Sequence, residues 1–253
     1  MINTDLAFSS ASDLVALLAT KQVSPVELTE LFFRRIDDLD PQLNSYILLT
    51  HDEALRAAKI AESEIMRGID LGPLHGLPIS IKDTQMTKGV RTTSGSLIYK
   101  DRVPDKDSAI VESIKQAGAI ILGKTNTSEF ALIGICDNRL GDSGRNPWNT
   151  SYTPGGSSGG AGAATAAFLC PIATGADGGG SIRIPASLCG IYGIKPTQGR
   201  VSGYTGLGAP PMPNLFGQQG PMSRTVQDSA LLLKVIAEHD RRDPISLREP
   251  VPD

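Results

Sequence analysis

Residues 154–185 read PGGSSGGAGAATAAFLCPIATGADGGGSIRIP, and this stretch decides the fold that the sequence predicts. Glycine gives the backbone access to conformations that other residues rarely adopt, and it lets the chain approach a ligand closely. Between the two glycine clusters, residues 160–169 are small and mostly apolar, which favours a helix packed closely against a sheet. Residues 171–176 follow as a candidate strand that ends at Asp177. A helix followed by a buried strand indicates an α/β arrangement.

The chain on either side of this stretch continues the alternation of helices and strands. Residues 24–27, SPVE, are a capping box with proline at the first helical position, and Pro41 is expected to stop the helix that follows. Further helices are predicted at 51–67, 107–117, 126–132 and 225–238, and further strands at 77–83, 119–122 and 191–194. We therefore expect an α/β protein with a helical region at 1–70, an α/β core at 71–238 and a loose tail at 239–253.

Composition and charge exclude several classes of protein. The 253 residues are 40% hydrophobic and 20% charged, which is typical of a soluble globular protein and not of a disordered one. The net charge of −3 leaves no positive surplus for a nucleic-acid backbone, and no apolar run has the length of a membrane span. Asp5 and Asp13 stand where an export signal would carry basic residues. Cys136, Cys170 and Cys189 are therefore expected to be reduced thiols of a cytoplasmic protein, and their spacing fits no zinc site.

Two short patterns resemble well-known motifs, and we reject the first and disfavour the second. Residues 118–125, GAIILGKT, match a phosphate-binding P-loop, but the apolar run between the glycines favours a strand over a loop of exposed N–H groups. Residues 155–159, GGSSG, match the nucleophile elbow of α/β-hydrolases, which requires an acid and a histidine further along the chain. The one histidine after this pattern is His239, in the expected tail, so a Ser–His–Asp enzyme is disfavoured.

Lysine, aspartate and glutamate are the candidate bases if one of these serines is a nucleophile. Asp177 is the one charged residue between positions 148 and 182, so the base must come from outside that segment. Lys82 ends the apolar strand LPISIK, where burial would lower its pKa and allow the neutral amine to act as a base near pH 7. The pattern alone favours the alternative, in which Lys82 faces solvent and pairs with Asp83.

The second glycine cluster, residues 175–181, reads GADGGGS and has two interpretations. Three successive glycines followed by serine form a turn whose backbone N–H groups can point at one spot, as an oxyanion hole requires. A flexible turn, or an anion-binding nest at the start of a helix, explains the same residues equally well. Both interpretations stay open on these residues alone.

Three longer blocks occur in order along the chain. They are Gly72-Pro-Leu-His-Gly-Leu-Pro-Ile-Ser-Ile-Lys82-Asp83, then Pro154-Gly-Gly-Ser157-Ser158-Gly-Gly160, and then Asp177-Gly-Gly-Gly-Ser181-Ile-Arg183-Ile-Pro185. Shorter matching pieces lie at residues 123–130, 146–148, 189–197 and 220–225. In this ordered series, from about residue 24 to residue 238, the sequence resembles the amidase signature family. A single glycine and serine run would be a weak match, whereas the series is very specific.

The resemblance implies a fold, a reaction and a set of site residues. The fold would be a mixed twisted β-sheet with helices on both faces. Ser181 would attack an amide carbonyl, Ser157 would carry a cis peptide bond and pass protons, and Lys82 would act first as base and then as acid. The oxyanion hole would consist of the N–H groups of Gly178, Gly179, Gly180 and Ser181. The resemblance implies no metal and no cofactor.

Three further residues are expected to support this site, and two features depart from the family pattern. Ser158 is expected to hydrogen-bond locally, and Asp177 and Arg183 to pair and hold the glycine turn. Ala176 stands where the family usually has Ser or Thr. Family members are also longer, so we expect a C-terminally shortened fold whose open sheet edge promotes association, for example as a homo-oligomer.

The sequence therefore favours an amidase that converts a carboxylic amide, whether small, aryl or oligomeric, to a carboxylate and ammonia or an amine through a Ser181 acyl-enzyme. No direct contact with nucleic acid or membrane is expected. One alternative is the amidase subunit of a glutamyl-tRNA amidotransferase, which needs partner chains and usually has Thr in place of Gly179 and Gln in place of Ile184. Another is an inert chain that binds amides or partners without turnover.

Overall fold

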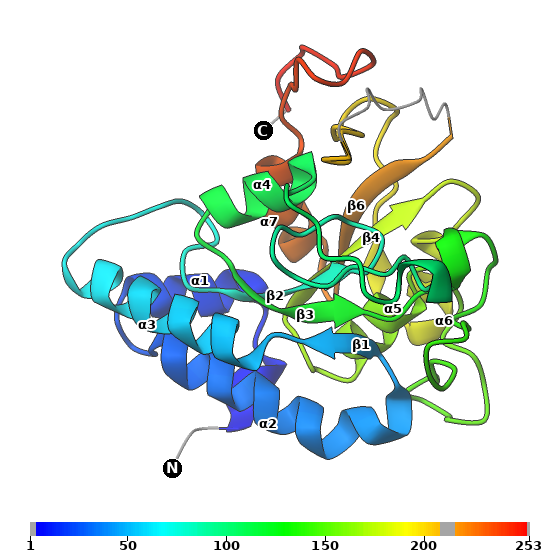
Figure 1. Cartoon of the computed structure of the whole chain (residues 1–253). Coiled ribbons are helices and arrows are strands. Elements are labelled where there is room, and N and C mark those ends of the chain that lie inside the picture. The colour runs from blue at the N-terminus through cyan, green and yellow to red at the C-terminus, as the bar shows by residue number, and fades with distance from the viewer. Residues whose placement is uncertain (1–3, 208–215, 252–253) are drawn as a thin grey trace.

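The computed structural model describes residues 4–207 and 216–251 (Figure 1). The helices are α1 (Ala11–Ala19), α2 (Pro25–Leu43), α3 (His51–Met66), α4 (Ala109–Gln116), α5 (Gly159–Ala166), α6 (Arg183–Cys189) and α7 (Val226–Ile236). The strands are β1 (Tyr46–Leu49), β2 (Pro78–Lys82), β3 (Ile120–Thr125), β4 (Ile172–Asp177), β5 (Tyr192–Gly193) and β6 (Gln218–Ser223). Short 3₁₀ turns lie at η1 (Thr4–Phe8), η2 (Leu97–Tyr99) and η3 (Glu129–Ala131).

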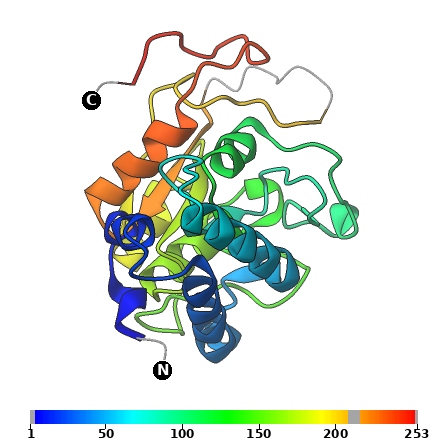
Figure 2. The same cartoon turned by 90° about the vertical axis from the view of Figure 1, so that its left-hand side faces the viewer.

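The strands form one mixed sheet in the order β1-β3-β2-β4-β6-β5. Strand β2 is parallel to both β3 and β4, whereas β1, β6 and β5 join antiparallel. In Figure 1, α2 lies below strands β1 to β3 and α4 lies above them, and Figure 2 shows α7 apart from α2. The predicted mixed α/β sheet with helices on both faces is confirmed. The carboxyl ends of the parallel strands β2 and β4 carry Lys82 and Asp177, so both residues lie at one edge of the sheet.

Helix α2 begins as predicted but ends later than predicted. The Ser24 hydroxyl accepts backbone N–H groups at the start of the helix, and the Glu27 side chain accepts the Ser24 N–H at 3.0 Å. Pro41 does not stop the helix, which continues to Leu43. Proline in the last turn removes one hydrogen bond and its fixed φ suits a helix, so termination falls to Asn44 instead, at φ 50°.

The segments on either side of residue 126 test two further predictions. The apolar run of the rejected P-loop pattern lies in strand β3, as expected. The helix predicted at 126–132 is wrong, because only η3 forms there. Phe130 and Ala131 have φ of 51° and 58°, and the left-handed region interrupts a right-handed helix.

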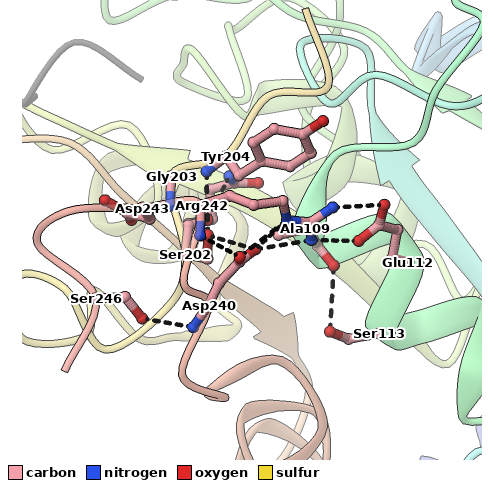
Figure 3. A network of polar contacts seen from close by, with 11 residues as sticks. Ala109, Glu112, Ser113, Ser202, Gly203, Tyr204, Asp240, Arg242, Asp243 and Ser246 are labelled. Atoms are coloured by element: carbon pink, nitrogen blue, oxygen red, sulfur yellow. Dashed lines mark hydrogen bonds and ion pairs between the residues drawn. The ribbon is translucent and has the colours of Figure 1, made fainter. Parts of the chain in front are cut away.

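The segment expected to be a loose tail is attached to the domain through side chains (Figure 3). Arg242 donates to Glu112 of α4, with Nη1 3.0 Å from Oε1, and its guanidinium carbon lies 3.9 Å from the centre of the Tyr204 ring. The Gly203 N–H donates to Asp243 Oδ2 at 2.7 Å. Residues 239–251 contain no helix or strand, yet these bonds secure them against α4 and the loop around Gly203.

Candidate active site

Lys82 lies at the end of β2 with no exposed surface. Its Nζ donates to Ser157 Oγ and to Ser158 Oγ, both at 2.8 Å, and lies 3.5 Å from the Ala176 carbonyl oxygen. The solvent-facing lysine that the pattern alone favoured is therefore wrong. Asp83 is buried as well, but its carboxylate accepts the Thr93 N–H at 3.0 Å and makes no ion pair with Lys82.

Burial is the main cause of the low basicity of Lys82. It lowers the pKa of Lys82 from 10.5 to about 7, because an ammonium loses hydration inside the protein. The negative charge of Asp177 raises this pKa, but less than burial lowers it. Burial also raises the pKa of the Cys136 thiol to about 12, so this group is neutral near pH 7. A substantial part of the Lys82 population is therefore a neutral amine near pH 7.

The two serines in contact with Lys82 belong to the loop before α5. The peptide bond between Gly156 and Ser157 is cis, and Ser157 and Ser158 are both fully buried. A Cβ at position 156 would stand 2.2 Å from the Ile135 carbonyl oxygen, so glycine is required at this close approach. The Ser158 N–H donates to the Ser181 carbonyl oxygen at 3.1 Å, which joins this loop to the glycine turn.

The glycine turn is held by Asp177, the last residue of β4. Arg183 binds its carboxylate through two bonds, Nε to Oδ2 at 2.8 Å and Nη2 to Oδ1 at 3.0 Å. The Gly180 N–H donates to Asp177 Oδ1 at 2.7 Å. Burial raises the pKa of Asp177, but the bonds from Arg183 and from backbone N–H groups outweigh burial and hold the pKa at about 2. Asp177 and Arg183 thus pair across the turn, as the sequence led us to expect.

One N–H group expected in the oxyanion hole is directed elsewhere. Because the Gly180 N–H donates to Asp177, it is not available to stabilise an oxyanion. Ser181, Ser157 and Gly178 line a cavity of about 510 Å³ together with Asp177. Among the described residues, no hydrogen bond joins the hydroxyls of Ser157 and Ser181. The structure thus brings Lys82, Ser157 and Ser158 into direct contact and places Ser181 at the same cavity.

Sequence reasoning anticipated Ser158 as a supporting residue, without its bond to Lys82, and it missed Gln85. Ser158 was expected to hydrogen-bond locally, and it does bond to Ala176, but it also accepts directly from Lys82. Gln85 lines the cavity and bonds to Thr174 and Gly175, which no motif indicated. The adjacent serines of GGSSG were the available signal for the bond of Ser158 to Lys82, whereas nothing local in the sequence signals Gln85.

The described part of the chain offers no group of three or more metal-ligating His, Cys, Asp or Glu side chains. Within the same residues, no helix is both long and apolar enough to cross a bilayer.

Comparison with known proteins identifies the family. Residues 27–253 match the family described as Amidase, and the chain belongs to the amidase signature family. It is 43% identical to a glutamyl-tRNA(Gln) amidotransferase subunit from Carboxydothermus hydrogenoformans, over 98% of this chain and 51% of that protein.

Solved structures of the family match as well. A bacterial aryl acylamidase is 38% identical with a TM-score of 0.90, over 96% of this chain and 50% of that one. The peptide amidase of Stenotrophomonas maltophilia is 36% identical with a TM-score of 0.90, over 99% and 52%. The chain spans about half the length of these relatives.

Proposed function

We propose that the chain hydrolyses a carboxylic amide through an acyl-enzyme on Ser181. The observation that carries the proposal is the fully buried Lys82 amine, 2.8 Å from Ser157 Oγ, beside a cavity that Ser157 and Ser181 both line. A neutral amine in that place can accept a proton near pH 7, the task that histidine performs in other serine hydrolases.

The first half of the reaction forms the acyl-enzyme. Ser181 Oγ attacks the amide carbonyl carbon while its proton passes to Ser157 Oγ, and Ser157 passes its own proton to the Lys82 amine. The negative charge on the carbonyl oxygen is stabilised by the N–H groups of Gly178, Gly179 and Ser181. The proton then returns from Lys82 through Ser157 to the leaving nitrogen, so the C–N bond breaks and ammonia or an amine departs.

The second half repeats this sequence with water. Lys82, through Ser157, accepts a proton as water attacks the Ser181 ester, and it returns that proton to Ser181 Oγ as the carboxylic acid leaves and then ionises in solvent. Ser158 holds the Lys82 amine from a second side at 2.8 Å. Asp177 and Arg183 fix the turn that presents the oxyanion donors.

A serine-directed fluorophosphonate probe tests the proposal on the 253-residue chain. The probe should add to Ser181 with loss of fluoride, as measured by intact mass and peptide mapping. Labelling should be absent in Ser181→Ala and much slower in Lys82→Ala, while simple amides are hydrolysed by the unmodified chain. Folded protein with neither labelling nor amide turnover would instead support the inert, amide-binding alternative.

A second candidate function is supported by one observation, the 43% identity to a glutamyl-tRNA(Gln) amidotransferase subunit. In that function the chain would release ammonia from glutamine for an aminoacyl-tRNA held by partner chains. Glutaminase activity that appears only when partner chains and aminoacyl-tRNA are added would favour this function. Hydrolysis of simple amides by the isolated chain would favour the general amidase.

A further inference from the structure

Strands β2 and β4 carry the two halves of the candidate site, yet their backbones pair at a single register position. Ser80 lies opposite Ala173, and no further register pair follows toward the carboxyl ends. Lys82 is two residues beyond this position on β2. A parallel ladder would normally continue through regularly spaced backbone bonds. Some other contact must therefore keep Lys82 at a fixed distance from the end of β4.

That contact is made by two buried side chains. The Lys82 N–H donates to Thr174 Oγ1 at 3.1 Å in place of a backbone carbonyl. Thr174 Oγ1 in turn donates to Gln85 Oε1 at 2.5 Å, and Gln85 Nε2 donates to the Gly175 carbonyl oxygen at 3.3 Å. Thr174 is fully buried and Gln85 is 3% exposed, so solvent does not compete for these bonds.

The chemistry of the groups sets the direction of each bond. The Thr174 oxygen already accepts from Lys82, so its single proton is free to be donated to the Gln85 oxygen. The Gln85 NH₂ then faces a carbonyl, which can only accept. The amide of glutamine, with an acceptor and a donor at one end of its side chain, matches both neighbours.

The backbone of Gln85 is fixed as well. Its N–H donates to the Lys82 carbonyl at 3.0 Å, and its carbonyl accepts from Lys124 Nζ at 2.5 Å. Lys124 is fully buried and also donates to Thr87 Oγ1 at 2.8 Å. The Gln85 side chain therefore extends from an anchored backbone toward β4.

We propose that Gln85 and Thr174 form a clamp that sets the position of Lys82 relative to Ser157 and the glycine turn, with Gln85 as a positioning residue. The clamp closes the gap where β2 and β4 stop pairing. Residues 175–177, which follow Thr174 directly, lead into the turn that carries Ser181. Catalytic geometry is sensitive to displacements of about 1 Å, which can cost on the order of 10²-fold in rate.

The catalytic test of this inference rests on the proposed function and uses the rate of fluorophosphonate labelling at Ser181. Gln85→Met and Thr174→Val preserve size but remove the polar groups, and each should slow labelling on the order of 10- to 10²-fold. Thr174→Ser keeps the hydroxyl and should restore most of the rate. Because the two residues act as one unit, the double variant should lose little more than the slower single variant.

Thr29→Val is the matched control, because Thr29 is a fully buried threonine of α2 whose hydroxyl has no hydrogen-bond partner among the described residues. It should label at the wild-type rate. Labelling of Gln85→Met and Thr174→Val at the wild-type rate would overturn the clamp. An equal decrease of the labelling rate in Thr174→Ser and Thr174→Val would also overturn it. If Gln85→Met does not fold, by circular dichroism, the two Thr174 variants decide the question.

A second measurement separates failure of the clamp from failure of the proposed function. Nitrogen-detected NMR of the Lys82 amine follows its titration whether or not Ser181 reacts. A released strand end admits water, so the pKa of Lys82 should rise from about 7 toward 10.5 in Gln85→Met and Thr174→Val but not in Thr174→Ser. An unchanged titration in all variants would overturn the clamp. An unlabelled wild-type chain would overturn only the proposed function.

Discussion

The rate at which Ser181 reacts should follow the protonation of Lys82. Burial lowers the pKa of this lysine from 10.5 to about 7. In the proposed mechanism, only the neutral amine can accept the proton that Ser181 passes on through Ser157. The neutral form predominates above the pKa, so the labelling rate must increase with pH and then level off.

The size of the effect follows from the pKa. With a pKa of about 7, the neutral fraction is about 9% at pH 6 and about 91% at pH 8, so the rate should increase roughly tenfold and then reach a plateau. An ordinary lysine pKa of 10.5 would leave about 0.3% of the amine neutral at pH 8. The rate would then continue to rise about tenfold per pH unit beyond pH 9.

The assay is the pseudo-first-order rate of fluorophosphonate labelling across this pH range, followed by intact mass. Lys82→Met should remove the midpoint near pH 7. Lys124→Met is an informative control, because burial also lowers the pKa of Lys124 to about 7 while Lys124 contacts neither serine. The Lys124→Met variant should keep the midpoint near pH 7, because Lys82 remains. Lys115→Met removes a partly exposed lysine and should change neither the labelling rate nor its pH midpoint.

Two outcomes would refute this reasoning. One is a wild-type rate that climbs without a plateau above pH 8. The other is a pH profile whose midpoint moves in Lys124→Met and persists in Lys82→Met, because the titrating group would then be Lys124.

Three further predictions concern the residues around Lys82. Ser157→Ala should slow Ser181 labelling at least about 10²-fold, since proton transfer loses its relay; an equal rate would exclude Ser157 from the path. Gly180→Ala should reduce the rate of Ser181 labelling about tenfold or more. The backbone at this position has φ of +118°, and the new Cβ would stand 2.9 Å from Ile184 Cδ1. The turn must therefore shift, and a small displacement of the site lowers the reaction rate steeply. Arg183→Met should lower the melting temperature by about 2–4 °C at pH 7, because the partly exposed ion pair with Asp177 is lost. The decrease should be smaller near pH 2, where Asp177 becomes protonated. Calorimetry at both pH values checks this prediction.

Much of the fold could be predicted because the deciding signals are local. Strands β2, β3 and β4 and helix α5 were predicted correctly. Their signals are short apolar runs and small apolar residues next to glycine clusters. The errors arose where a single residue outweighed the pattern. Pro41 is tolerated in a last helical turn, and the left-handed backbone at Phe130 and Ala131 is set by tertiary contacts that no periodicity records.

The candidate site was only partly accessible from the sequence. Lys82, Ser157 and Ser181 lie in separate blocks, and their juxtaposition depends on β2 and β4 being parallel neighbours. The pattern around Lys82 could not distinguish a buried amine from a solvent-facing one, because burial depends on which loops cover the strand end. The Gln85 contacts span about 90 positions of the chain and have no local signature.

The complete burial of Lys82 has two effects. It lowers the pKa of the amine, and it keeps the amine out of reach of reagents in solution. Lysine-directed acylating agents react with neutral amines, so a low pKa in an open pocket would make a lysine their preferred target. Lys82 presents no surface to them, and its amine is enclosed by two serine hydroxyls. Covalent modification should therefore accumulate first on exposed lysines, whereas Lys82 retains a free amine for proton transfer.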